Sequence, residues 1–345
     1  MKVLHVLNTA SYSGAENVVC QIISMFRGDV EMVYASPDGP IRQVLEDRGI
    51  PFFPLKKLSL HEVKRAVRAV RPDVLHAHDF RASLYCAAAG GAPVLSHLHN
   101  NPPFLQGRGL RARLYAFSCR RYARILTVSP SVFDEFLLGA LYRDKVVCVG
   151  NPIDTAAIRA RADEETADVT YDIGFCGRLT EQKDPLTFLA VVERLRADFP
   201  ALRAAMIGDG ELRETVAASV RERGLSDCVT LYGFLSNPFP VLRRFRLLCM
   251  PSRWEGFGLA AVEGLALGVP VLCSGAGGLS GIVDERCGRL CADVNEYTEE
   301  ATRVLRNPGM WEDKHRGALT RAAELDNYDT YRAALFGAYA AAAKN

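Results

Sequence analysis

Residues 251–263 read Pro-Ser-Arg-Trp-Glu-Gly-Phe-Gly-Leu-Ala-Ala-Val-Glu, directly after the apolar run Leu247–Met250. The pattern predicts a buried strand, a glycine turn and then a helix. Gly256 and Gly258 have no side chains to shield their amides, and amides at the start of a helix attract anions. We therefore expect this turn to hold a diphosphate.

Two glutamates mark the same stretch. Glu255 stands in the turn, whereas Glu263 stands in the expected helix among Ala, Val and Leu. A carboxylate in such apolar surroundings needs a polar partner, and a ribose diol would supply one. The alternative is a helix-capping carboxylate at 255 and a solvated helix position at 263.

Outward from this stretch, short apolar runs alternate with amphipathic segments. Such runs are typical of strands that are buried on both faces of a parallel sheet. In the first half we expect strands at 3–7, 31–35, 51–55, 73–78, 93–99, 125–129 and 146–149, and helices at 15–26, 41–48 and 60–71. In the second half we expect strands at 172–176, 204–207, 229–232, 247–250 and 269–273, helices at 185–198, 211–223 and 258–267, and a helical tail over 311–343.

The polar stretch 155–170 interrupts this rhythm, and 345 residues are long for one domain. We expect a Rossmann-like N-terminal domain over 1–160 and a second one over 161–325. A C-terminal helix over 326–345 is expected to pack back on the first domain. The predicted fold class is α/β, with two doubly wound domains facing a central cleft and ligands at the carboxyl ends of the strands.

Composition excludes several classes of protein. Apolar residues make up 49% of the chain and charged residues 24%, which excludes disordered and fibrous proteins. Lys and Arg outnumber Asp and Glu by 21 to 16 in residues 1–165 and fall short by 21 to 24 thereafter. No acidic residue lies between Asp79 and Asp134, an interval that contains Arg81, Arg108, Arg111, Arg113, Arg120, Arg121 and Arg124.

This basic interval is either a solvated helix face or a surface for anionic lipid or a lipid-linked pyrophosphate. Nucleic acid is not an expected partner, because the segment lacks interleaved stacking aromatics. Ten scattered cysteines, no signal peptide and no apolar run of ~18 residues favour a cytoplasmic location, including the inner face of a membrane.

Several further motifs occur in a definite order. They are Ser13–Glu16, His76–His78, His97–Asn100, Asn151–Asp154, Gly177–Leu179 with Lys183, Ile207–Glu211 and Gly277–Leu279. With Glu255 and Glu263 separated by seven residues, this ordered set resembles the retaining GT-B glycosyltransferases of family 4, also called group 1. The resemblance spans nearly the whole chain.

The resemblance implies a role for each matching residue. Arg178 and Lys183 hold the donor diphosphate, Glu263 holds the nucleotide ribose, and Glu255 holds the hydroxyls of the donor sugar. The implied catalytic residues are His99, Glu255, Arg178 and Lys183. The implied donor-binding residues also include Gly14, Gly177, Gly208, Gly210, Phe234, Gly256, Phe257, Gly258 and Leu259, and the implied acceptor-side residues are Asn100 and Asn151.

The implied reaction moves a sugar, with retention of configuration, from a nucleotide-diphosphate donor, UDP by default, to a saccharide or lipid-linked acceptor. Cell-surface polysaccharide or glycolipid synthesis is the expected context. No metal or other cofactor is expected, because two cations and several amides can stabilise the departing diphosphate. The sequence departs from the family at Gly281, where a glutamate is usual, and at Ser13, where a glycine is common.

Alternatives remain at this stage. His76 with His78 and His97 with His99 are i, i+2 pairs on strands, and such pairs can bind zinc. Residues 275–281 are glycine-rich, but their register does not fit a dinucleotide-binding turn. A nucleotide-sugar 2-epimerase or a non-catalytic sugar-nucleotide-binding protein would share the same architecture.

Overall fold

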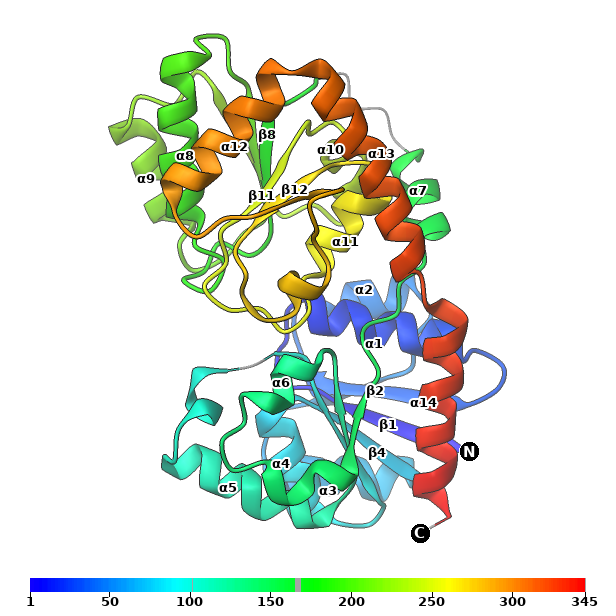
Figure 1. The fold of residues 1–345 in the computed structure, drawn as a ribbon. Helices are drawn as coiled ribbons and strands as arrows, with labels where there is room; N and C mark the ends of the chain where they lie inside the picture. Colours follow the sequence, from blue (N-terminus) through cyan, green and yellow to red (C-terminus); the bar gives the residue numbers. More distant parts are fainter. Residues whose placement is uncertain (101, 165–168, 345) are drawn as a thin grey trace. The chain divides into compact units, whose positions relative to one another are not determined.

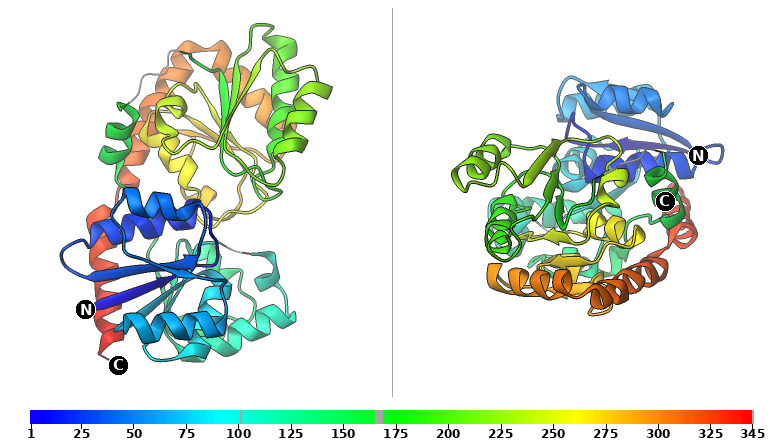
Figure 2. Two further views of the ribbon diagram at one scale, coloured as in Figure 1. Left: turned by 180° about the vertical axis from the view of Figure 1, so that it is seen from behind. Right: turned by 90° about the horizontal axis from the view of Figure 1, so that it is seen from above.

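The computed structural model describes residues 1–100, 102–164 and 169–344. These residues form two compact units, one of Met1–Pro152 with the described part of Asn327–Asn345, the other of Ile153–Asp326. Each unit is a parallel sheet with helices on both faces (Figures 1 and 2). The α/β architecture and the two parallel-sheet domains expected from the sequence are confirmed.

Unit 1 contains a seven-stranded sheet in the order β3-β2-β1-β4-β5-β6-β7. Its strands are β1 (Lys2–Val6), β2 (Glu31–Pro37), β3 (Phe52–Leu55), β4 (Val74–His78), β5 (Val94–Leu98), β6 (Tyr122–Thr127) and β7 (Val146–Cys148). Its helices are α1 (Gly14–Met25), α2 (Ile41–Asp47), α3 (Leu60–Val70), α4 (Asp79–Ala89), α5 (Leu110–Ser118), α6 (Pro130–Asp134) and α14 (Tyr328–Ala343), with 3₁₀ turns η1 (Pro103–Gln106), η2 (Cys119–Arg121) and η3 (Ala140–Lys145).

The central strands of this sheet are buried on both faces, which explains their unbroken apolar runs. Parallel pairing sets His5 of β1 beside His76 of β4, and His78 of β4 beside His97 of β5. Histidines from three adjacent strands therefore gather inside the unit.

The last helix, α14, belongs to unit 1. It packs on β4 and β6 with Tyr331, Leu335 and Tyr339 fully buried. Arg332 pairs with Asp29 after α1. Residues from the two ends of the chain thus share one core.

Unit 2 contains a six-stranded parallel sheet in the order β10-β9-β8-β11-β12-β13. Its strands are β8 (Ile173–Cys176), β9 (Ala204–Ile207), β10 (Val229–Gly233), β11 (Leu248–Met250), β12 (Val271–Cys273) and β13 (Gly288–Leu290). Its helices are α7 (Thr155–Ala162), α8 (Pro185–Asp198), α9 (Arg213–Glu222), α10 (Phe239–Leu242), α11 (Leu259–Ala266), α12 (Val294–Arg306) and α13 (Pro308–Leu325), with the 3₁₀ turn η4 (Gly277–Gly281).

One boundary differs from the sequence-based expectation. Residue 160 falls inside α7, which belongs to unit 2 and packs on α10 and α11. Ala162 of α7 is fully buried in the core of unit 2, although the surrounding sequence is polar enough to suggest a linker. The boundary therefore precedes α7.

The helical tail expected over 311–343 consists of α13 in unit 2 and α14 in unit 1, and the division lies close to residue 326, where the separate C-terminal helix was expected to begin. The two helices separate at Asp326 and Asn327, whose side chains form hydrogen bonds with Thr155 and Asn151. Asp326 Oδ2 accepts from the amide and the hydroxyl of Thr155 at 3.0 and 2.8 Å. Asn327 Nδ2 donates to the carbonyl of Asn151 at 3.1 Å. Among the described residues, no helix is long and apolar enough to cross a membrane.

Candidate active site

The strand order of unit 2 reverses between β8 and β11, which lie side by side. In open α/β sheets, ligands bind outside the carboxyl ends of the strands at this reversal. Gly177 and Arg178 directly follow β8, and the turn Pro251–Gly258 directly follows β11. The structure thus brings the two segments that the sequence singled out to the same edge of one sheet.

Lys183 and Glu255 form an ion pair at this edge. Lys183 Nζ donates to Glu255 Oε1, and the side chains are only 16% and 6% exposed. Ser252 Oγ donates to the same carboxylate oxygen at 3.0 Å. A nearly buried carboxylate is tolerable only with such partners, so the ion pair and the hydroxyl hold Glu255 in place.

Gln182 joins the two segments. Its Nε2 donates to the carbonyl of Trp254 at 3.0 Å, its Oε1 accepts from Arg178 Nη2 at 3.2 Å, and its carbonyl accepts from the amide of Arg253 at 2.8 Å. Gln182 is buried. It therefore fixes the Arg178 side chain relative to the glycine turn, a role that the sequence did not reveal.

Gly208 and Gly210 allow the segment after β9 to lie against the segment after β8. Gly208 has φ +137°, and a Cβ there would lie 1.9 Å from the carbonyl oxygen of Gly177. A Cβ at Gly210 would lie 2.5 Å from the carbonyl oxygen of Leu179. The side-chain carbons of Lys183 reach to 3.7 Å of where a Cβ on Gly177 would stand. These glycines shape the site by close backbone approach.

Helix α11 begins in the middle of the predicted anion-binding turn. Its N-cap is Gly258, with φ +107°, which provides no side-chain cap for the first-turn amides. Amides of this kind, from Leu259 onward, favour a negatively charged ligand. Phe257 is partly buried against the core, and the carbonyl oxygen of Gly256 would lie 2.8 Å from a Cβ on Gly278 in η4.

Glu263 lies on α11 and is partly buried. Burial raises the pKa of its carboxyl to about 7, although the charges of Arg161 and Lys183 act in the opposite direction. Within the described residues no hydrogen bond satisfies this carboxyl. Glu263 is therefore poised to accept hydrogen bonds from a ligand, as a ribose diol would donate.

The sequence also singled out Phe234 and Gly281 in unit 2. Phe234 follows the edge strand β10 and is 54% exposed. The structure does not link it to Lys183 or Glu255 by any bond within the described residues. Gly281, the position where the family usually has glutamate, has open space around it, and its carbonyl accepts from Arg321 at 2.6 Å.

The remaining predicted residues lie in unit 1. Gly14 begins α1, and a methyl group there would meet no atom within 4 Å. His99 follows β5, and Asn100 comes next, beside residue 101, which is outside the described part. Asn151 is buried, and its carbonyl is bound by Asn327. That contact is structural, so an acceptor role for Asn151 and Asn100 stays a prediction.

Two family models match the chain. The model described as Glycosyltransferase Family 4 matches residues 5–157, and the model described as Glycosyl transferases group 1 matches residues 170–307. Together they cover both units in the order that the motifs indicated. The chain belongs to the group 1 glycosyltransferases.

Known relatives agree with this assignment. The glycosyltransferase is 26% identical over 296 residues to glycogen synthase of Mycobacterium tuberculosis, a match covering 80% of this chain and 70% of that one. It is 29% identical over 191 residues to the N-acetylgalactosamine-N,N'-diacetylbacillosaminyl-diphospho-undecaprenol 4-alpha-N-acetylgalactosaminyltransferase of Campylobacter jejuni, covering 54% and 51%.

Solved structures fix the fold of the glycosyltransferase. Anabaena Alr3699/HepE, crystallised with UDP and glucose, superposes with a TM-score of 0.85 over 98% of both chains at 17% identity. The fold is therefore GT-B, as the resemblance implied.

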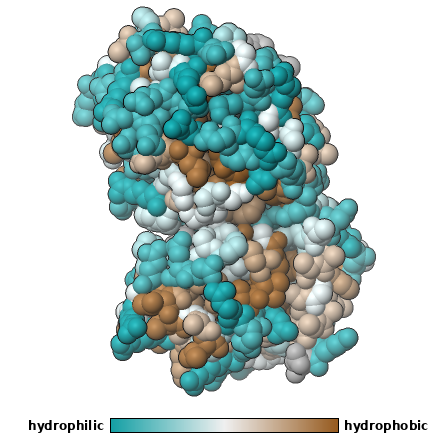
Figure 3. All heavy atoms as spheres, in the orientation of Figure 1, coloured by the Kyte–Doolittle hydropathy of each residue, from teal (hydrophilic) through white to brown (hydrophobic). Residues whose placement is uncertain are grey.

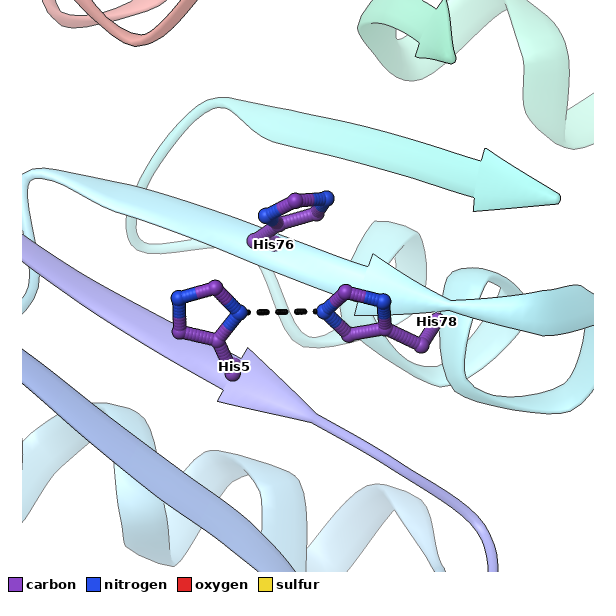
Figure 4. Close-up of side chains that lie close together, drawn as sticks. All are labelled: His5, His76 and His78. Atoms are coloured by element: carbon purple, nitrogen blue, oxygen red, sulfur yellow. Dashed lines mark hydrogen bonds between the residues drawn. The ribbon is translucent and has the colours of Figure 1, made fainter. Parts of the chain in front are cut away.

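Unit 1 of the glycosyltransferase also contains an unusual cluster of buried histidines (Figure 4). His5 Nδ1 lies 3.0 Å from His78 Nε2, and His78 Nδ1 lies 2.8 Å from His99 Nε2. Next to these hydrogen-bonded histidines, His76 Nδ1 lies 2.7 Å from the Tyr339 hydroxyl oxygen, and His76 Nε2 lies 3.1 Å from His97 Nδ1. The zinc alternative considered from the sequence concerns these residues.

Two histidine triads in this cluster have ring nitrogens within 4.8 Å of one another, one of His5, His76 and His78, the other of His78, His97 and His99. Two imidazole ligands on a tetrahedral zinc would place their nitrogens ~3.3 Å apart. The contacts of 2.8–3.1 Å fit N–H···N hydrogen bonds better. We therefore describe the cluster as hydrogen-bonded, and the absence of a metal stays a prediction.

Asp79 is a further residue that the sequence did not single out. It has φ +64°, uncommon for a residue with a side chain, at the end of β4. Its Oδ1 accepts from the main-chain amide of His99 at 3.0 Å. Strained residues of this kind gather at functional sites. Asp79 thus fixes the backbone at His99.

Proposed function

We propose that the glycosyltransferase moves a sugar from a UDP-sugar to a saccharide or lipid-linked acceptor with retention of configuration and without a metal. The observation that carries this proposal is the Lys183–Glu255 pair at the strand-order reversal, beside the uncapped start of α11. A cation, free helix amides and a carboxylate at one edge suit a ligand with both phosphate and hydroxyl groups.

In the proposed complex, Arg178, Lys183 and the amides of Gly258 and Leu259 receive the diphosphate. Glu263 receives the ribose, because its carboxyl has no partner among the described residues. The hydroxyl groups of the donor sugar donate hydrogen bonds to Glu255. The UDP and glucose in the Anabaena neighbour support a nucleotide sugar of this kind.

The chemistry follows from the charges. The bond between the anomeric carbon and the β-phosphate oxygen breaks as positive charge develops on the sugar and negative charge on the diphosphate. Arg178, Lys183 and the helix amides stabilise the leaving group, as a metal would elsewhere. The departing phosphate oxygen takes the proton of the acceptor hydroxyl, which attacks the same face of the sugar.

Glu255 is poorly suited to the nucleophilic role in a double displacement. Its carboxylate accepts from both Lys183 and Ser252, which lowers its nucleophilicity. The proposal therefore assigns Glu255 to donor hydroxyls. His99 is proposed to act near the sugar, as the family resemblance implies.

The test of this function is a panel of UDP-, GDP- and ADP-sugars incubated with the full-length protein and simple glycoside or polyprenyl-diphosphate acceptors in EDTA. We expect UDP release with UDP-sugars in EDTA. Release that requires an added divalent metal would contradict metal independence, and a product epimerised at C2 without transfer would replace the transferase by an epimerase.

The surface around α5 supports a membrane-linked acceptor. Leu110, Leu114 and Phe117 are exposed at helical spacing, and Leu141 in η3 is 85% exposed. Figure 3 shows apolar side chains gathered over this part of unit 1. Apolar side chains that stand out on one helix face suit the boundary between lipid headgroups and acyl chains.

Arginines lie close to these apolar side chains in the sequence. Those at positions 108, 111, 113, 120, 121 and 124 are all exposed. Within the described part of the chain, none forms an ion pair with a carboxylate, in keeping with the acid-free interval 80–133. Basic side chains together with exposed apolar groups complement an anionic bilayer surface. The Campylobacter relative is named for an undecaprenol-linked substrate, which supports an acceptor of this type.

Vesicle sedimentation tests the membrane contact. Each surface arginine is worth ~1 kcal/mol, so Arg111→Ser/Arg113→Ser should weaken binding to phosphatidylglycerol vesicles about 30-fold. Arg203→Ser/Arg221→Ser removes the same charge from exposed positions of unit 2 and should leave binding unchanged. Equal losses in both variants, or equal binding to phosphatidylcholine vesicles, would contradict the contact.

A further inference from the structure

The hydrogen-bonded chain His5–His78–His99 leads from the core of unit 1 to a site residue. His5 and His78 are buried, whereas His99 is partly exposed. The two contacts use both nitrogens of His78, Nε2 toward His5 and Nδ1 toward His99. His78 therefore transmits the protonation pattern of one neighbour to the other.

All three rings are neutral. Burial lowers the pKa of His5 to about 3, that of His99 to about 4, and that of His78 well below its usual value, with neighbouring histidines adding to the effect at His78. A neutral imidazole has one N–H and one lone pair. Both contacts can be satisfied only if all three N–H groups point the same way along the chain.

The buried end of the chain selects the direction. His5 Nε2 is buried and has no hydrogen-bond partner among the described residues. If the chain ran from His99 to His5, this nitrogen would carry a proton, and a buried donor would be left unsatisfied at a cost of about 1–3 kcal/mol. In the opposite direction this nitrogen carries only a lone pair. A buried lone pair without a partner is more common than a buried N–H without one, so the direction from His5 to His99 is favoured.

We propose that His5 and His78 are positioning residues that hold His99 as its Nδ1–H tautomer. His5 Nδ1–H donates to His78 Nε2, and His78 Nδ1–H donates to His99 Nε2. His99 then presents Nδ1–H as a donor, whereas imidazole in water prefers the Nε2–H form. The catalytic use of this donor rests on the proposed function, in which His99 hydrogen-bonds a sugar hydroxyl or phosphate oxygen.

A divalent metal fits His5, His78 and His99 less well than a chain of hydrogen bonds does. Histidine ligands normally donate their second N–H to an acceptor, which fixes the ring and supports the charge. His5 Nε2 has no such acceptor within the described residues. His78 could not bind one metal through a nitrogen and keep both of its present contacts.

Long-range ¹H–¹⁵N correlation spectra of the full-length protein, labelled with ¹⁵N-histidine, report which nitrogen of each ring is protonated. Single substitutions assign the signals. We expect the Nδ1–H pattern for His5, His78 and His99. An Nε2–H pattern for His99 would overturn the proposal, and so would loss of the N–H signals on adding stoichiometric zinc.

Two isosteric variants of His5 test whether its hydrogen bond to His78 sets the tautomer of His99. His5→Asn keeps an N–H donor at the δ position, whereas His5→Asp has the same shape and, when ionised, can only accept. His5→Asn should retain the His99 pattern. His5→Asp should reverse the direction of the chain, because His78 Nε2–H then donates to the introduced carboxylate and His99 Nε2–H donates to His78 Nδ1. The loss of the donor at His99 Nδ1 should lower kcat about tenfold at an unchanged KM for the UDP-sugar, which corresponds to the loss of one hydrogen bond.

The spectra separate the tautomer proposal from the proposed function. An unchanged His99 pattern in His5→Asp at pH 8, or equal effects of both variants, would show that His5 acts by packing alone and would overturn the proposal. If His5→Asp does not fold, the wild-type spectrum decides. An Nδ1–H pattern in a protein that turns over no nucleotide sugar would contradict the function and leave the tautomer assignment intact.

Discussion

Lys183 and Glu255 are 72 positions apart in the chain, yet Lys183 Nζ donates to Glu255 Oε1 where the strand order of unit 2 reverses. Each charge satisfies the other. A diphosphate would compete with Glu255 for Lys183 and free the carboxylate for hydroxyl groups. The pair therefore keeps both side chains in place before the donor arrives.

Replacing Glu255 by Gln should affect binding and turnover in opposite directions. The substitution removes a negative charge beside the proposed diphosphate, so the Kd for UDP should fall about two- to fivefold, or ~0.5–1 kcal/mol for a partly screened charge. Turnover should fall without being abolished, because the amide still contacts sugar hydroxyls. Calorimetric titration and initial rates measure these effects. Weaker UDP binding would contradict the competition, and a glycosyl ester trapped on Glu255 in the wild type would contradict front-face attack.

Glu263 should make donor binding dependent on pH. Its pKa is raised to about 7 by burial, so the carboxyl is largely protonated at pH 6 and ionised at pH 8. Ribose hydroxyls stabilise the ionised form, so the affinity for UDP-glucose, which does not itself titrate in this range, should rise between pH 6 and pH 8. Glu263→Gln should remove this rise. The same slope in the variant would assign the titration to another group.

The raised pKa of Glu263 also has a consequence for stability. The folded state binds more protons than the unfolded state between the ordinary pKa of 4.5 and about 7. The contribution of this carboxyl to the free energy of unfolding therefore decreases as the pH rises from 4.5 to 7. Glu263→Gln should be more stable than wild type at pH 8, and urea denaturation at pH 5 and pH 8 measures the difference.

The sequence predicted the parts of the site that are local. The strand, turn and helix over 247–267 follow from apolar runs and glycines, and the alternation of strands and helices predicts two parallel sheets. The sequence could not reveal that Gln182 hydrogen-bonds to the glycine turn, because a glutamine in a polar loop has no distinctive pattern. The tail was expected to divide between residues 325 and 326, and the break lies there although no proline or glycine marks it. That break is set by long-range hydrogen bonds.

The histidine cluster shows the same limit. The i, i+2 pairs at 76/78 and 97/99 were visible in the sequence and suggested metal ligands. The contribution of His5 depends on the pairing of β1 with β4, and that of Tyr339 depends on the packing of α14. Neither contact has a local signature.

Gly208→Ala and Gly14→Ala form a matched pair. A methyl group at Gly208 would lie 1.9 Å from the carbonyl oxygen of Gly177, at φ +137°. Overpacking and backbone strain together should cost about 2–5 kcal/mol of stability. The methyl group at Gly14 meets no atom within 4 Å, so that variant should melt within about 2 °C of wild type. Thermal denaturation compares them, and equal melting temperatures would contradict the close approach at Gly208.

The stereochemical outcome can be read from the product. With an α-linked UDP-sugar as donor, the product should carry an α-linkage, and its rate of formation should not change in EDTA. Anomeric proton coupling constants of the purified product decide the first point. A β-linked product would show inversion and would require a general base that the proposal does not contain.

The central claim, a donor site at this edge of unit 2, is tested most directly by measuring the Kd of UDP for Lys183→Met. The measurement is made at a temperature at which circular dichroism shows that the variant is folded. We expect the Kd to rise about 30-fold, or ~2 kcal/mol for a lost charge pair. Arg253→Met removes a charge from the same turn, but Arg253 is 53% exposed and pairs with Glu181 and Asp184, so UDP should bind it as it binds wild type. Wild-type affinity in Lys183→Met would contradict a donor site at this edge of unit 2.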